Sequence, residues 1–189
     1  MKRFVVLVCI IMSFVCAKSS ILASDYAAIT SNPKIADALQ CLKSVGANDV
    51  IGILNGNNAD RKPIRVHFRE LEVYGLGNCE AITMRNKAGN IVIFINKKYA
   101  ESPSEAIACL IAHESQHHTL TGSRAEEIRA WIKEVSTWNA FVRQDRTIAM
   151  SNDKLVKRMN HISKMYNAPN GHQTVEKFVA NHPAYAGLN

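Results

Sequence analysis

The sequence of 189 residues lacks internal repeats and low-complexity linkers, and it contains only 5 prolines and 9 glycines. These absences exclude fibrous and disordered classes. With 47% hydrophobic and 21% charged residues, the chain is long enough to bury one well-formed core. We therefore expect a single globular domain.

The sequence also lacks a basic run interleaved with aromatic residues, although its formal net charge is +7. The lysines and arginines are scattered, which gives no indication of nucleic-acid binding. The charge by itself predicts only a weak attraction to anionic polymers of the cell envelope. No pattern indicates an oligomeric state.

One apolar run, from Phe4 to about Ala17, is too short to span a membrane comfortably. Two basic residues precede it and small residues follow it, which is the order of a secretory signal peptide. We predict that residues 1–24 are the signal peptide, with cleavage somewhere in 17–24. Residues 25–189 then form the mature domain, which is secreted or periplasmic and has no stable membrane insertion.

Hydrophobic periodicity predicts an α+β domain. Two short helices come first, and three strands follow, which we interpret as a small antiparallel sheet. A helix carrying the motif described below, and then further C-terminal helices, complete the chain. The predicted helices cover about 33–46, 50–54, 102–120, 123–138, 153–166 and 174–180, and the predicted strands cover 63–70, 79–85 and 91–96.

The segment 102–120 contains His113, Glu114 and His117 in the pattern HExxH. Histidines four residues apart lie on one face of an α-helix, so they can share a metal ion while Glu114 lies beside them. Two imidazoles and a nearby carboxylate suit Zn²⁺. The motif predicts one zinc ion per chain.

A catalytic zinc site usually takes three protein ligands, so a third must come from elsewhere. The next predicted helix offers Glu126, Glu127 and Glu134. No histidine follows at the short spacing of the metzincin pattern. A glutamate of this helix is therefore the candidate third ligand.

With these residues the chain resembles the gluzincin class of zinc metallopeptidases, in which a glutamate from a following helix completes HExxH. The order of strand IVIFIN, helix LIAHESQHH and helix EEIRAW is most similar to the small minigluzincin-like peptidases, over about 91–138. The resemblance implies a zincin-like fold and a peptide or protein substrate. It also implies zinc bound by His113, His117 and a glutamate, with Glu114 as the general base. Many gluzincins carry an acidic or amide residue where this chain has Trp131.

Helical geometry separates the neighbouring glutamates. At about 100° per residue, Glu127 borders the apolar stripe that includes Trp131, whereas Glu126 points away and is predicted to face solvent. We predict Glu127 as the third ligand, with Glu126 as the alternative, and expect Glu126→Ala to leave zinc binding nearly unchanged. Glu134 is predicted to orient a ligand histidine by accepting a hydrogen bond from it. Trp131 cannot accept this bond at the position where many gluzincins carry an acidic or amide residue.

The three cysteines of the mature chain would lie in an oxidising compartment. We predict a disulfide between Cys41 and Cys79, because Cys109 lies in the motif helix and is interpreted as a small buried residue. The alternative role of Cys79 is a thiolate that binds the metal in a latent form.

No pattern identifies the donor that would stabilise the oxyanion of the reaction. The predicted function is a secreted or periplasmic zinc metallopeptidase that hydrolyses peptide bonds. The alternative is a non-catalytic envelope or secreted binding protein that retains a zincin scaffold. The candidate oxyanion donors are His118, His161, Tyr166, His172 and His182.

Overall fold

The computed structural model describes residues 25–188, so the predicted signal peptide lies outside the described residues. The fold is α+β, as predicted. Among the described residues, no helix is both long enough and apolar enough to cross a membrane. In chain order the elements are α2 (Pro33–Ser44), α3 (Asn48–Leu54), β1 (Arg65–Arg69), η1 (Glu72–Tyr74), β2 (Ala81–Arg85), β3 (Ile91–Asn96), η2 (Lys97–Tyr99), α4 (Ser104–Ser115), α5 (Arg124–Gln144), η3 (Arg146–Met150), α6 (Lys154–Tyr166), α7 (Gly171–Asn181) and η4 (Pro183–Tyr185).

The sheet is mixed, and its strand order is β1-β3-β2. A turn at residues 86–90 joins β2 to β3, and these strands pair antiparallel, with Thr83 opposite Ile93. β1 pairs parallel to β3, with Val66 opposite the same Ile93. The prediction of a wholly antiparallel sheet is wrong for β1, because the longer connection through η1 lets the chain place β2 on the far side of β3.

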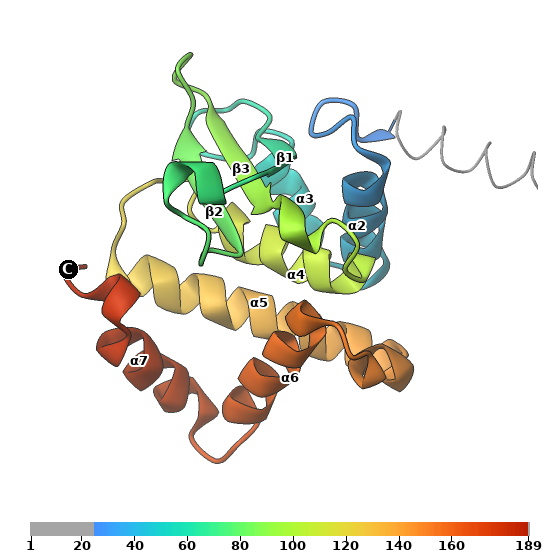
Figure 1. The fold of residues 1–189 in the computed structure, drawn as a ribbon, viewed down its shortest axis with the longest axis vertical. Helices are drawn as coiled ribbons and strands as arrows, with labels where there is room; N and C mark the ends of the chain where they lie inside the picture. The colour runs from blue at the N-terminus through green and yellow to red at the C-terminus, as the bar shows by residue number, and fades with distance from the viewer. Residues whose placement is uncertain (1–24, 189) are drawn as a thin grey trace, which may run out of the picture.

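Helix α4 lies at the centre of the molecule, between the sheet, α2 and α5 (Figure 1). All its residues from Ala106 to Ser115 are buried. The segment AIACLIA has small and branched apolar side chains all round the helix, as expected for a helix enclosed on every side. The HExxH motif therefore begins in the core.

Helix α4 ends five residues earlier than predicted, at Ser115 rather than Leu120. The chain continues in tighter turns, in which the His117 amide donates to the Glu114 carbonyl (3.1 Å). Leu120 then adopts a left-handed conformation with φ of 52°. His117 consequently lies just beyond the helix, while His113 lies in its last turn.

The C-terminal helices pack on α5 through a second, smaller hydrophobic cluster. The side chain of Ser123 caps α5 by accepting a hydrogen bond from the Glu126 amide (3.2 Å). Below this end, α7 and η4 lie along α5, and α6 crosses its other half (Figure 1). The buried members of the second cluster are Trp131, Val135, Ile162, Val175 and Val179.

The three described cysteines are free, so the predicted disulfide is wrong. Cys41 is on α2 and packs against the main core, where burial raises its pKa to about 11. Cys79 precedes β2 and lines the cavity described below. The two thiols belong to different parts of the fold. Cys109 is buried in α4, as predicted.

Gly171 starts α7, three residues before the predicted start at residue 174. A Cβ atom added to Gly171 would lie 1.6 Å from the carbonyl oxygen of Tyr166. The close approach of two backbones at this point therefore requires glycine.

We predict that Gly171→Ala lowers the free energy of unfolding by at least ~2 kcal/mol, because α7 must move away from the end of α6. Gly52→Ala is the matched control, since Gly52 is helical and its added Cβ would meet nothing closer than 3.9 Å. Urea denaturation of both variants measures the difference. Equal stabilities would contradict the backbone contact.

Candidate metal centre

His113, His117 and Glu127 present ligand atoms that all lie within 4.8 Å of one another. The Nε2 atom of His113 is 3.8 Å from Glu127 Oε2, and the Nε2 atom of His117 is 3.6 Å from Glu127 Oε1. These separations exceed hydrogen-bond distances. They are close to the ~3.3 Å between two atoms that bind one tetrahedral zinc ion. The three side chains could hold a metal ion.

Glu127 supplies an independent test of whether a cation fits. Its Oε2 atom is buried and has no hydrogen-bond partner. Such an orphaned carboxylate oxygen is rare in folded proteins and is a sign of an absent ion or water. Two imidazoles and one carboxylate are a donor set that zinc prefers.

Glu134 orients the ring of His113 from its Nδ1 side, in the role predicted for it. Glu134 is completely buried, and its Oε2 atom lies 3.0 Å from His113 Nδ1. Arg158 donates to both oxygens of this carboxylate. Burial alone would raise the pKa of Glu134, but Arg158 and His113 hold it at about 2. The ionised carboxylate accepts a hydrogen bond from Nδ1–H, which leaves the Nε2 lone pair facing Glu127.

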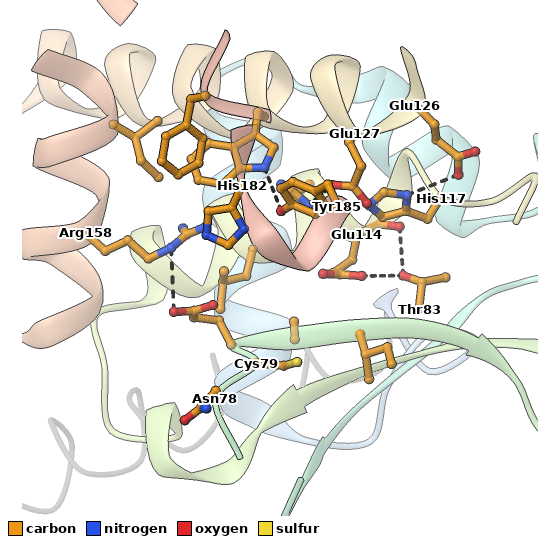
Figure 2. A pocket seen from close by; sticks show the side chains of 18 of the residues that line it. Asn78, Cys79, Thr83, Glu114, His117, Glu126, Glu127, Arg158, His182 and Tyr185 are labelled. Atoms are coloured by element: carbon orange, nitrogen blue, oxygen red, sulfur yellow. Dashed lines mark hydrogen bonds and ion pairs between the residues drawn. The ribbon is translucent and has the colours of Figure 1, made fainter. Parts of the chain in front are cut away.

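The prediction that Glu126 faces solvent is wrong. Glu126 is completely buried, and its Oε1 atom lies 3.1 Å from Nδ1 of His117 (Figure 2). Its other oxygen accepts hydrogen bonds from Thr119 (3.3 Å) and Thr121. The loop between α4 and α5 folds over this side of α5, which a helical projection of α5 alone leaves open. Glu126 therefore holds His117 as Glu134 holds His113.

Glu114 points into the cavity beside the three ligand candidates. Its Oε2 atom accepts a hydrogen bond of 2.7 Å from the hydroxyl of Thr83 on β2 (Figure 2). The same hydroxyl lies 2.9 Å from the Glu114 carbonyl oxygen, so its single proton is shared between the two acceptors. Strand β2 thus fixes the Glu114 carboxylate next to the three candidate metal ligands. Thr83 carried no sequence signal beyond its place in a strand.

The site opens into a cavity of about 930 Å³, within the size range of ligand pockets. Strand β2 forms one wall, and residues of α6, α7 and η4 form the other. Among the predicted oxyanion donors, His161 and His182 line this cavity within the described chain, whereas His118, Tyr166 and His172 lie outside its lining.

Tyr185 also reaches the cavity, from η4, and sequence reasoning missed it (Figure 2). Its phenol oxygen accepts a hydrogen bond of 3.0 Å from Nε1 of Trp131. Burial raises the pKa of Tyr185 well above its ordinary value, so the phenol keeps its proton. No local pattern could have linked Tyr185 to a motif more than 60 residues earlier.

Comparison of the chain with protein-family models, curated proteins and solved structures finds no match. The chemistry of the site is therefore inferred from its geometry. Within the described residues, that geometry brings together His113, Glu114, His117, Glu126, Glu127 and Glu134.

We predict that Glu127→Ala weakens zinc binding by more than ~100-fold, because it removes a ligand. Glu126→Ala should weaken it by ~10–100-fold, because His117 loses the acceptor that orients it. Glu101→Ala is the control, since Glu101 is exposed near the opposite end of α4. Zinc titration against a competing chelator measures all three. An unchanged affinity in Glu127→Ala would exclude it as a ligand.

Proposed function

We propose that the protein is a zinc metallopeptidase of the gluzincin type. The observation that carries this proposal is the convergence of two Nε2 atoms on the Glu127 carboxylate, one oxygen of which is orphaned, with Glu114 beside them in the cavity. A buried glutamate also holds each Nδ1 atom, an arrangement typical of metal-binding histidines. The predicted signal peptide would carry this activity to the periplasm or the exterior.

Zinc held by His113, His117 and Glu127 would supply a Lewis acid that polarises the scissile carbonyl and lowers the pKa of the attacking water. Glu114 is the general base of this proposal. Its carboxylate is not among the three ligand candidates, so it is available to accept the proton of the water and return it to the leaving amine. Thr83 keeps this carboxylate in place.

Tyr185 is the proposed donor to the oxyanion. Because its oxygen accepts from Trp131, its own O–H remains to donate into the cavity. A donor fixed before the reaction stabilises the charge that develops on the substrate oxygen.

Strand β2 is the proposed binding edge for the substrate. One side of β2 pairs with β3, and the other is an edge of the described sheet. Ala81, Ile82 and Thr83 line the cavity. An extended peptide could therefore form backbone hydrogen bonds with β2 while its scissile bond lies near Glu114.

We predict that Glu114→Gln retains zinc and fold but loses hydrolysis of an unstructured protein such as casein, because an amide cannot accept the proton. Zinc content, circular dichroism and casein cleavage measure the three properties. Retained cleavage would remove Glu114 from the mechanism. Zinc binding without any cleavage by the unaltered protein would favour a non-catalytic binding protein.

We predict that Tyr185→Phe lowers kcat by ~10²–10³-fold, as removal of one oxyanion donor does in other hydrolases, with zinc affinity unchanged. KM should change little, because the lost hydrogen bond forms in the transition state. Steady-state kinetics with a casein-derived peptide measure both constants. A variant with the unaltered kcat would return the choice of donor to His161 and His182.

A further inference from the structure

The cavity contains a carboxylate, Glu80, that the proposed reaction does not use. Glu80 directly precedes β2, lines the cavity, and has a side chain that is 32% exposed. Its nearest described cation is Arg158, whose Nε atom lies 3.7 Å from Glu80 Oε1. This separation is too long for a hydrogen bond.

Arg158 is already engaged. It donates through two nitrogens to the completely buried Glu134, and its guanidinium lies over the ring of Trp131 at 5.2 Å. A buried carboxylate that loses such a partner is strongly destabilised. Arg158 therefore remains with Glu134 and does not turn to a substrate carboxylate.

Glu80 is left with an unbalanced charge. One guanidinium charge faces two carboxylates, so the group of Glu80, Arg158 and Glu134 has a net charge of −1 when all three are ionised. The other acids of the cavity have partners or roles: Glu114 accepts from Thr83, Glu126 binds His117, and Glu127 faces both histidines. The charge is exposed in the cavity, in a protein that is basic overall.

We infer that Glu80 forms a subsite for a positively charged group of the substrate, an inference that rests on the proposed peptidase function. The cation is an ammonium or guanidinium, which can come from a lysine or arginine side chain or from a free N-terminus. Glu80 precedes Thr83 by three residues, about 10 Å along a strand. The cation therefore belongs two to four residues from the scissile bond.

Peptide binding to the zinc-loaded Glu114→Gln protein tests the subsite without requiring turnover. The probes are acetylated and amidated six-residue peptides with one lysine at each position in turn, and the same peptides with norleucine instead. A third set has norleucine and a free N-terminus. Isothermal titration calorimetry gives the affinities. Each titration is repeated with a double variant that carries Glu114→Gln together with Glu80→Gln or, as the matched control, together with Glu101→Gln.

We expect a lysine peptide or the free N-terminus to bind about tenfold more tightly than its neutral counterpart. Glu80→Gln should reduce this ratio to about one, while Glu101→Gln should keep it. Raising the salt concentration should also reduce the ratio in the protein that retains Glu80, a measurement that needs no Glu80 variant. Tighter binding of the lysine peptides would identify a side chain as the source of the cation, and tighter binding of the peptides with a free N-terminus would identify the terminal ammonium.

Equal affinities for charged and neutral peptides, or a preference that survives Glu80→Gln, would overturn the subsite. Failure of the proposed function gives a different result, because the protein with Glu114 intact would then cleave no peptide or would cleave equally well as Glu114→Gln. The binding ratio can be read in either case, so the two failures are distinguishable.

Discussion

The buried charge of Glu134 is the constraint on which the site depends. An ionised carboxylate without access to water requires close partners. Glu134 has two, Arg158 from α6 and His113 from α4. These contacts tie α4, α5 and α6 together at one point. The orientation of a candidate metal-binding imidazole and the packing of the C-terminal helices therefore depend on the same interaction.

The packing of helix α4 in the core fixes the position of the HExxH motif. Its small apolar residues let α2, α5 and the sheet approach from different sides, so the helix has little freedom to rotate or slide. His113 and Glu114 follow directly in the last turn and inherit this rigidity. His117 lies beyond the helix and depends instead on Glu126, which the threonines of the loop hold in turn.

The sequence was sufficient wherever local spacing determines the contact. The pattern of four residues brings His113 and His117 together, and the stripe on α5 points Glu127 inward. The sequence was insufficient where a segment distant along the chain determines the surroundings of a side chain. A loop fold buries Glu126, a strand pairing places Thr83 at Glu114, and the packing of η4 brings in Tyr185. The parallel pairing of β1 is also long-range, since no turn specifies it.

One face of α5 supplies three different parts of the site. Glu127, Trp131 and Glu134 follow the spacing i, i+4, i+7, so they form one stripe along the helix. Glu127 faces both histidines, Trp131 donates to Tyr185, and Glu134 supports His113. Trp131 occupies the middle of this stripe. Because Glu134 contacts His113 from the next turn, this position is free to anchor the C-terminal segment. A rotation of α5 by one residue, about 100°, would remove all three contacts at once.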